Sequence, residues 1–341
     1  MSSPFDSRPL ASLCPCVDRF VGRRILVWGD LVADRFLHGT TTRVSREAPA
    51  LVLRYEDEEI RPGGAGNAAL NAAALGASVT VFGYLGSDNE GSGLRAALQQ
   101  AGIDTSQAIE RSDGSTPVKT RVMAGGFHTV RQQILRIDHD RPWRHDSKLD
   151  EDLVAAVRAA LVNTDGLLIS DYGLGAVSAS SYARLATVIG GIGNLPVTLD
   201  SRFDLLRYRR VTAATPNEAE LENALGVSLN GDPTAIEEAG RDLQRQLEAE
   251  HLLITRGSYG MTLLRPDRDP VHLPIHGTDQ IADVTGAGDT VIATLTLALA
   301  TGASVLDGAR IANIAAGLVV MKHGTATVPR EELLAALRET A

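Results

Sequence analysis

Patterns typical of helices and of strands alternate along this chain, most regularly in its second half. A helix pattern over 150–162 precedes a strand pattern over 166–170, and a second pair follows at 178–190 and 196–200. Because strand–helix–strand units close by right-handed crossovers, the alternation predicts an α/β fold with a mostly parallel central sheet and flanking helices. The other predicted elements are strands at 24–29, 78–84, 211–214 and 251–255, and helices at 66–75, 93–100, 234–248 and 291–300 and from Pro216.

Two strand-rich segments, near 40–60 and 116–138, interrupt this alternation. The second segment indicates a hairpin, because two strand-like runs flank the pair Gly125–Gly126. We expect the two segments to pair as a small sheet outside the main one, a β-lid. The chain then divides into an N-terminal arm over residues 1–22, either loose or a short helix, and one domain over residues 23–335 that carries the lid.

The composition narrows the classes of partner and compartment. The 341 residues are 44% hydrophobic, enough for one large α/β domain or two small ones. A net charge of −9 and the lack of a basic run argue against a nucleic-acid partner. The longest apolar run, Val291–Ala300, is shorter than the ~20 residues that span a bilayer. We therefore expect a cytoplasmic protein with no membrane partner, in which Cys14 and Cys16 are free thiols.

The most informative stretch runs from Asp283 to Thr290 and contains the turn Gly286-Ala287-Gly288 followed by Asp289. An apolar helix pattern follows at once, and the start of a helix favours an anion through its unpaired N–H groups and dipole. A carboxylate beside bound phosphate is a poor choice for simple binding. It is well placed as a base that accepts a hydroxyl proton while a phosphoryl group arrives. An ordinary loop with an aspartate in the first helical turn explains the stretch equally well.

A second glycine-rich stretch spans Gly63 to Ala69 and contains Gly64-x-Gly66-x-x-Ala69, the spacing of a dinucleotide-binding fingerprint. That interpretation fails, because acidic residues stand where the fingerprint needs a buried strand. Gly63 and Gly64 instead allow close backbone approach, and Asn67 offers donors and acceptors to a ligand. A tight turn that caps a helix is the alternative.

Asp30 and Asp34 follow the first predicted strand. Ligands bind at the carboxyl ends of strands in open α/β sheets, and carboxylates accept hydrogen bonds from sugar hydroxyls. A solvated turn is an equally good explanation of this pair.

The helix that starts near Pro216 carries a polar pair at its mouth. Thr215 and Glu218 fit a capping box, so Glu218 is expected to be structural. Asn217 and Glu220 are three residues apart and share a helix face, where they could order Mg²⁺ and its waters beside a nucleotide.

Thr255-Arg256-Gly257 and Gly260 follow a predicted strand. The two glycines would let the backbone pass close to a nucleotide, although a β-turn between two strands explains them as well.

In this order, the motifs resemble those of the ribokinase-like (PfkB-type) sugar kinases, over about residues 23–330. The resemblance implies a three-layer fold with a β-lid, ATP and Mg²⁺ as cofactors, and transfer of the γ-phosphoryl group to a sugar hydroxyl. Asp289 would accept the hydroxyl proton, with the N–H groups of Gly286, Ala287 and Gly288 stabilising the transferring group. Asp283 would help to hold a monovalent cation such as K⁺. The resemblance places the sugar against Asp30, Asp34, Gly63, Gly64, Asn67 and Asp171, Mg²⁺ and phosphate against Asn217 and Glu220, and the nucleotide against Thr255, Arg256, Gly257, Gly260 and Asn313.

Within that family the chain is most similar to the heptose 7-phosphate kinase branch. The segments that carry this similarity are 29–39, 42–49, 61–65, 133–138 and 170–172. The similarity implies phosphorylation of the C1 hydroxyl of D-glycero-D-manno-heptose 7-phosphate, on the way to lipopolysaccharide core precursors.

One departure concerns the acceptor phosphate. That branch typically shows Asp-Tyr-x-Lys-Gly, whereas this chain has Leu174 in place of the lysine. We expect other cations to compensate, from among Lys119, Arg121, Arg131, Arg136 and Arg202.

The sequence also leaves two alternative functions open. A kinase for another sugar, sugar phosphate or nucleoside is the alternative enzyme, and a catalytically silent sugar sensor is the alternative outside catalysis. The lid strands could pair across a two-fold axis to bury their edges, so we expect a homodimer.

Overall fold

A nine-stranded sheet forms the centre of the protein in a computed structural model that describes residues 8–125, 131–277, 284–322 and 324–339. The strand order is β13-β12-β11-β10-β9-β8-β1-β4-β5, and every pair from β11 to β5 is parallel. β12 and β13 add an antiparallel edge. The predicted mostly parallel sheet is thus confirmed. Its strands are β1 (Arg24–Gly29), β4 (Ser78–Gly86), β5 (Ala108–Arg111), β8 (Gly166–Asp171), β9 (Val197–Ser201), β10 (Ala213–Ala214), β11 (His251–Thr255), β12 (Met261–Leu264) and β13 (Val271–Leu273).

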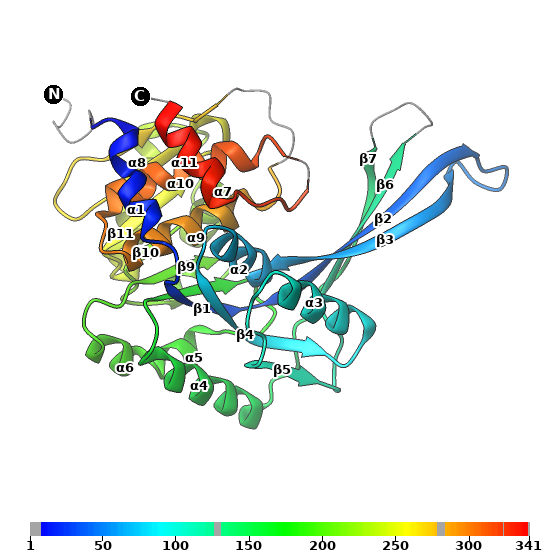
Figure 1. Cartoon of the computed structure of the whole chain (residues 1–341), viewed down its shortest axis with the longest axis horizontal. Helices are drawn as coiled ribbons and strands as arrows, with labels where there is room; N and C mark the ends of the chain where they lie inside the picture. The colour runs from blue at the N-terminus through cyan, green and yellow to red at the C-terminus, as the bar shows by residue number, and fades with distance from the viewer. Residues whose placement is uncertain (1–7, 126–130, 278–283, 323, 340–341) are drawn as a thin grey trace.

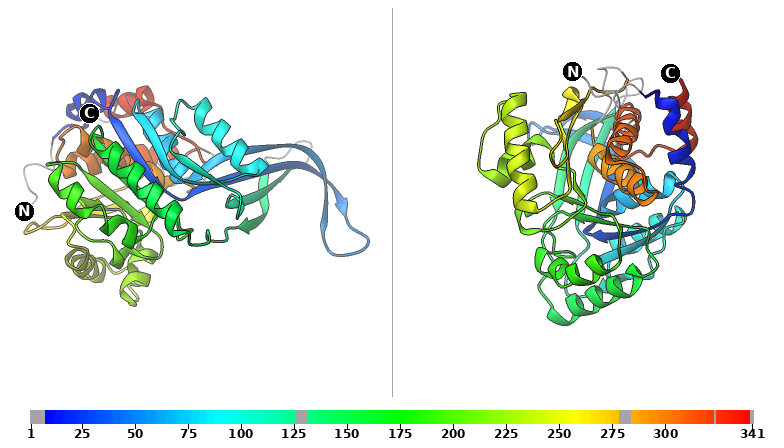
Figure 2. Two further views of the ribbon diagram at one scale, coloured as in Figure 1. Left: turned by 90° about the horizontal axis from the view of Figure 1, so that it is seen from below. Right: turned by 90° about the vertical axis from the view of Figure 1, so that its left-hand side faces the viewer.

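Helices cover both faces of this sheet, because side chains alternate between its two sides (Figure 2). Along β1, Ile25 and Val27 enter one hydrophobic core, while Leu26 and Trp28 enter the other. The first face is covered by α1 (Cys14–Asp18), α2 (Ala65–Ala74), α3 (Asn89–Gln100), α9 (Ala287–Ala300), α10 (Val305–Val319) and α11 (Arg330–Glu339), and the second by α4 (Ser147–Leu161), α5 (Ala179–Ala183), α6 (Ala186–Gly191), α7 (Glu218–Leu225) and α8 (Pro233–Leu247). The result is a three-layer α/β fold.

The helix predicted over 178–190 is two short helices, α5 and α6, with a tight turn between them. Leu185 N–H donates to the carbonyl of Tyr182 in an i→i+3 bond that closes the first helix. In the part of the chain that the structure describes, 3₁₀ segments lie at Leu10–Leu13, Leu205–Arg207 and Gly257–Tyr259.

A second sheet projects from the body as a long lid (Figure 1). Its order is β3-β2-β6-β7, from β2 (Leu31–Val44), β3 (Leu51–Gly64), β6 (Val118–Gly125) and β7 (Gln132–His139). The two strand-rich segments therefore pair as predicted, but the lid begins directly after β1 rather than near residue 40. Leu31, Val32 and Ala33 are buried at its base, and the acids on either side of them had suggested a turn. The hairpin turn placed at Gly125–Gly126 lies partly outside the described residues.

The N-terminal segment from residue 8 packs into the body instead of standing apart from it. Val17 and Phe20 are fully buried in the core that also contains Leu333 and Leu337 of α11, and α1 lies beside α11 (Figure 1). Cys14 and Cys16 are buried there as free thiols, as expected. Within the described segments, no helix is both long and apolar enough to cross a membrane.

Candidate active site

Asp289 lies in the first turn of α9, where the chain emerges from a glycine turn. Gly286 is the N-cap residue in the left-handed region, with φ of 81°, and a Cβ there would come within 2.5 Å of Asn67 Nδ2. Glycine is therefore required to bring Asn67 against the helix start. Asn67 Nδ2 donates to Asp289 Oδ2 at 2.6 Å, and the Tyr172 hydroxyl donates to Oδ1 at 3.2 Å.

The Asp289 carboxyl is 6% exposed. This burial raises its pKa to about 6, against the opposing effect of the hydrogen bonds from Asn67 and Tyr172. A carboxyl with a pKa near 6 is largely ionised at neutral pH and still basic enough to accept a proton. Its environment is that of a general base.

The backbone N–H groups of the turn are not all available to a ligand. Ala287 N–H donates to the carbonyl of Val284 at 3.2 Å, so its predicted part in stabilising a phosphoryl group is not supported by this geometry. Gly288 has open space where a Cβ would stand and lines both neighbouring cavities. Gly286 lines one of them. Gly288, at the start of α9, is therefore the strongest candidate in this turn for binding an anion.

Two cavities of about 300 and 310 Å³ meet at this helix start. They share Asn217, Thr255, Val284 and Gly288. The first, the polar cavity, is otherwise lined by Asp171, Tyr172, Asp200, Arg202, Thr215, Glu220, Gly286 and Asp289. The second, the apolar cavity, is otherwise lined by Gly257, Gly260, Met261, Ile275, His276, Ala287, Val291, Asn313, Ala316, Gly317 and Val320.

Asn217 and Glu220 form the capping box of α7, in place of the predicted pair Thr215 and Glu218. Asn217 Oδ1 accepts from Glu220 N–H, and Glu220 Oε2 accepts from Asn217 N–H, both at 2.9 Å. Glu218 instead accepts from Arg256 Nε at 2.8 Å. The helix therefore starts two residues later than the sequence pattern suggested, and its cap residues face the polar cavity.

Asp200 lines the polar cavity and was missed by the sequence analysis, which named Arg202 only as a possible phosphate cation and Thr215 only as a helix cap, although both also line this cavity. Asp200 stands at the end of β9, and burial together with the nearby Glu220 and Asp289 raises its pKa. The Thr215 hydroxyl is buried with no hydrogen-bond partner. The rule that singled out Asp30, an acid at the carboxyl end of a parallel strand, would have found Asp200 too.

Asp30 does not line either cavity and serves the neighbouring loop. Its Oδ2 accepts from the N–H groups of Tyr172 and Leu174, and its Oδ1 accepts from Ala176 N–H, all at 2.9 Å. Burial raises the pKa of Asp30 to about 7. Asp30, which we predicted to bind the sugar, thus holds the loop that carries Tyr172 in its conformation.

Asp171 has a similar task at the start of that loop. Its carboxylate accepts from Gly173 N–H at 2.9 Å and from the hydroxyls of Ser201 and Tyr208 at 2.9 and 2.8 Å. Burial raises its pKa. Unlike Asp30, it borders the polar cavity.

Asp34 and the glycines of β3 form the lid side of the site. Arg121 Nη2 donates to Asp34 Oδ1 at 3.2 Å, and both side chains are buried. Gly63 faces the same carboxylate, and Gly64 lies against Tyr172. Burial raises the pKa of Asp34, while Arg121 and Lys119 oppose the shift.

Of the predicted cations, Lys119 and Arg121 lie beside the Asp34 carboxylate. Lys119 Nζ lies 5.0 Å from the centre of the Tyr172 ring, and burial lowers the pKa of Lys119 while Asp34 opposes the shift. Arg136 is exposed and paired with Asp138 on its own strand. Leu174 is buried and lines neither cavity.

The predicted nucleotide residues divide between the apolar cavity and the structure around it. Thr255, Gly257, Gly260 and Asn313 line the cavity. Gly260, with φ of 79°, lies so close to the carbonyl of Leu273 that a Cβ would collide with it. Arg256 lines neither cavity, because Glu218 holds its guanidinium. Asp283 lies outside the described residues.

The chain matches a known protein family over most of its length. The model of the pfkB family of carbohydrate kinases matches residues 23–332. Two curated proteins named "Bifunctional protein HldE" are similar: one from Methylococcus capsulatus is 43% identical over 92% of the chain, and one from Azotobacter vinelandii is 42% identical over 94%. The chain spans 64% and 65% of their lengths.

Solved structures with the same fold are more distant in sequence. Arabidopsis thaliana ribokinase complexed with ribose and ATP superposes with a TM-score of 0.68 at 21% identity, covering 93% of this chain and 99% of that one. Phosphofructokinase-2 from Escherichia coli in complex with substrates and products gives 0.75 at 18% identity, covering 94% and 99%. The predicted ribokinase-like three-layer fold is confirmed.

Proposed function

Because the chain belongs to the pfkB family of carbohydrate kinases, we propose that it transfers the γ-phosphoryl group of ATP to the C1 hydroxyl of D-glycero-D-manno-heptose 7-phosphate. The enzyme class is the predicted one, a phosphotransferase with a hydroxyl group as acceptor. Two observations support the heptose acceptor. Segments 29–39, 42–49, 61–65, 133–138 and 170–172 resemble the heptose 7-phosphate kinase branch, and the chain is more than 40% identical to proteins named HldE. The product would serve lipopolysaccharide core precursors, in the cytoplasm.

One observation carries the proposal: Asp289 stands buried at the start of a helix, at the junction of two cavities. The ionised carboxylate accepts the proton of the attacking hydroxyl from the side of the polar cavity. Asn67 and Tyr172 hold its two oxygens, so its orientation is fixed before substrate binds.

Backbone and amide donors face the place where phosphate charge would lie. The N–H of Gly288 points from the positive end of α9, which favours an anion. Asn217 uses its oxygen in the cap of α7, so its amide N–H group is left to face the polar cavity. We therefore assign Asn217 to phosphate oxygens rather than to the metal.

Mg²⁺, which accompanies ATP, neutralises phosphate charge when it is bound. Asp200 and Glu220 both face the polar cavity, and burial raises the pKa of each carboxyl group. Such a pair of carboxylates supplies the hard oxygen ligands that Mg²⁺ prefers, directly or through its waters. The proposed role of Asp283 at a K⁺ site rests on the family resemblance alone.

The acceptor phosphate would be bound by cations around the lid base. Lys119 and Arg121 on β6 lie beside Asp34 on β2, within the lid sheet, and Arg202 lines the polar cavity. Lys119 lies near the Tyr172 ring and the carboxylates of Asp34 and Asp138, and burial still lowers its pKa, so an added phosphate would stabilise its charge. These side chains would replace the lysine that the heptose 7-phosphate kinase branch typically has at the position of Leu174.

The lid also supports the proposed homodimer. Its strands expose apolar side chains that a partner would cover. They are Val44, Leu51, Tyr55, Ile134, Leu135 and Ile137. Light scattering at micromolar concentration is expected to give twice the mass of one chain, and a monomer would contradict this part of the proposal.

The testing experiment measures ADP release with Mg·ATP against a panel of acceptors. The panel contains both anomers of D-glycero-D-manno-heptose 7-phosphate, fructose 6-phosphate, fructose, ribose and adenosine. We expect strong preference for one heptose 7-phosphate anomer. Turnover only with another acceptor would keep the kinase and reject the heptose. Thermal stabilisation by a sugar without any turnover would instead establish the silent sensor.

A further inference from the structure

A third cavity, of about 240 Å³, lies on the other side of the loop that carries Tyr172. It shares no lining residue with the two cavities at Asp289. Gly175 and Ala176 border it, three and four residues after Tyr172, which borders the polar cavity. We refer to it as the loop cavity. Its remaining lining is Trp28, Tyr84, Trp143, Arg144, His145, Asp150, Leu153, Val154, Ser178, Ser180 and Ser181.

The aromatic wall of the loop cavity is fixed by hydrogen bonds. Trp28 Nε1 donates to the carbonyl of Ala176 at 2.9 Å, and the Tyr84 hydroxyl donates to Asp150 Oδ1 at 2.8 Å. Trp143 packs edge-on against Tyr84, with ring centres 6.1 Å apart. The wall therefore needs no rearrangement to receive a ligand, which removes one cost of binding.

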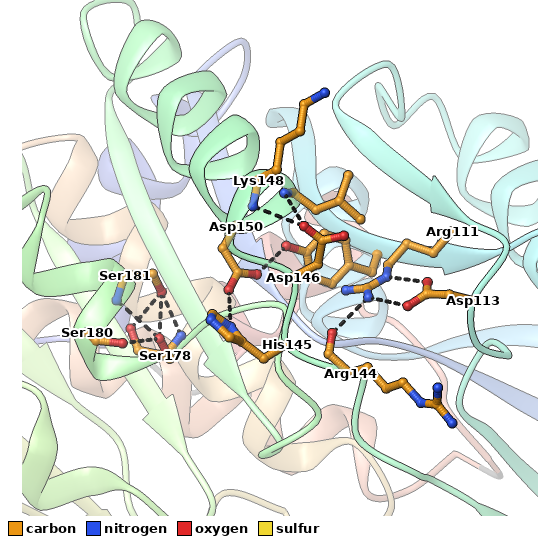
Figure 3. A network of polar contacts seen from close by, with 12 residues as sticks. Arg111, Asp113, Arg144, His145, Asp146, Lys148, Asp150, Ser178, Ser180 and Ser181 are labelled. Atoms are coloured by element: carbon orange, nitrogen blue, oxygen red, sulfur yellow. Dashed lines mark hydrogen bonds and ion pairs between the residues drawn. The ribbon is translucent and has the colours of Figure 1, made fainter.

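A buried cation supports this wall from behind. The Arg111 guanidinium lies 4.9 Å from the centre of the Tyr84 ring and 5.3 Å from that of Trp143. Figure 3 shows it held by Asp113 and by the carbonyl of Arg144. A buried arginine with such partners is a costly feature for a surface dimple, and it keeps the two rings in place.

The polar side of the loop cavity suits a neutral ligand with several hydroxyl groups. His145 Nδ1 lies 2.7 Å from Asp150 Oδ2, and the hydroxyls of Ser178, Ser180 and Ser181 cluster within 3.0 Å of one another (Figure 3). The Asp150 carboxylate repels an anion at close range, and the Arg144 guanidinium in the lining disfavours a cation. Hydroxyl groups both donate and accept, so they match every group present.

The size of the cavity limits that ligand to one sugar ring or a short polyol. Drug-sized ligands occupy about 300–1,000 Å³, more than this cavity offers. The apolar face of a sugar ring can pack against the half-buried Trp143 while its hydroxyls reach Asp150 and the serines.

The loop cavity is joined to the catalytic base by a short rigid path. Asp30 binds the N–H groups of Tyr172, Leu174 and Ala176 with one carboxylate, and Trp143 N–H donates to the carbonyl of Leu174. The loop from 172 to 176 thus moves as one piece. A ligand that favours one position of Ala176 favours one position of the Tyr172 hydroxyl on Asp289.

The geometry points to an effector site: the loop cavity binds an unphosphorylated sugar or polyol and adjusts the kinase through the Tyr172 loop. The link to turnover rests on the proposed kinase activity, whereas binding does not. The chain offers a built-in probe for binding, since Trp28 and Trp143 are its only tryptophans and both line this cavity.

Tryptophan fluorescence of the full chain is titrated with D-mannose, D-glucose and sorbitol, with mannose 6-phosphate and choline as an anion and a cation of similar size. A saturable change with at least one neutral compound is expected. Ser180→Phe, which fills the cavity and leaves the cap bonds between Ser178 and Ser181 in place, should abolish it. Ser180→Ala, which leaves the space open, should keep it. Asn67→Ala, at the other site, should leave the signal unchanged.

The same compound should shift the KM of the kinase for its acceptor about fivefold or more, in wild type and not in Ser180→Phe. No signal with any neutral compound, or one that persists in Ser180→Phe, would overturn the site. A preference for the anion or the cation would overturn its chemistry. Binding without any change in KM would overturn the link to the base. If no acceptor is phosphorylated at all, the fluorescence result still decides whether the site exists.

Discussion

Asp30 and Asp289 are both buried carboxylates with raised pKa values, about 7 and about 6, yet their surroundings differ in kind. Three backbone N–H groups of one loop occupy Asp30. Two side chains, Asn67 and Tyr172, hold Asp289 at the edge of a cavity. Burial and a raised pKa therefore do not by themselves identify a base. Access to a substrate, and donors that leave room for one, separate the carboxylate that we propose as the base from the one that holds a loop.

The largest difference between the two should appear in turnover. Asp289→Asn removes the proton acceptor and should lower kcat by about 10²–10⁴-fold, the range typical of a general base. Circular dichroism and ATP binding should be unchanged, because the asparagine still fits beside Asn67. Near-normal kcat in this variant would remove Asp289 from its role.

Asp289→Asn should also change how the stability of the protein depends on pH. Because burial raises the pKa of Asp289 above its value in the unfolded chain, its ionisation costs folding free energy as pH rises from about 4 to above 6. Asp289→Asn does not pass through this loss, so its melting temperature relative to wild type should increase over that window. Thermal melts at pH 4.5 and pH 8 measure the difference between variant and wild type, and a difference that stays constant or falls between the two pH values would contradict the prediction.

A substitution of Asp30 should mainly affect the folding stability of the protein. Asp30→Ala leaves three N–H groups without an acceptor, each of which costs about 1–3 kcal/mol when buried. Urea unfolding should therefore show a loss of several kcal/mol. Asp152→Ala, at an exposed position on α4, serves as the control and should change stability by less than about 0.5 kcal/mol. Equal unfolding midpoints for the two variants would show that the loop does not depend on Asp30.

A smaller contrast separates the two sides of the site. Asn67→Ala should weaken sugar binding more than ATP binding, because Asn67 lies between the lid base and Asp289. Asn217→Ala is the matched variant on the nucleotide side and should do the reverse. Calorimetric titration of each variant with sugar and with ATP gives both numbers. Equal losses for both ligands in Asn67→Ala would mark it as a structural cap.

The sequence alone could predict those parts of the site whose signal is local. The turn before Asp289, the glycines of β3 and the cap residues of α7 each lie within one short motif, and the alternation of elements predicted the parallel sheet. The role of Asp30 could not be read in this way, because its partners at 172–176 are some 140 residues away. Asp30 and Asp34, on either side of Leu31–Ala33, likewise hid the first lid strand. The buried groups that donate hydrogen bonds to these two carboxylates are distant in the sequence and come close only in the folded protein.

Asp200 and Arg256 show two other limits. Asp200 satisfied a rule already applied to Asp30 but stood outside any glycine-rich motif. Arg256 stood inside such a motif, and yet its partner Glu218 comes from another helix. Residue type and motif therefore located the site, while long-range hydrogen bonds decided which of its members face a ligand.

The most direct test of Asp289 as the proton acceptor is the pH dependence of kcat/KM for the acceptor, at saturating Mg·ATP, in wild type and Tyr172→Phe side by side. The rate should fall on the acid side with a midpoint near pH 6 in wild type, as the carboxylate becomes protonated. Tyr172→Phe removes a hydrogen bond that stabilises the ionised form, so its midpoint should lie at higher pH. Any titration of ATP itself is common to both enzymes. An acid limb with the same midpoint in both, or no acid limb in either, would contradict the account.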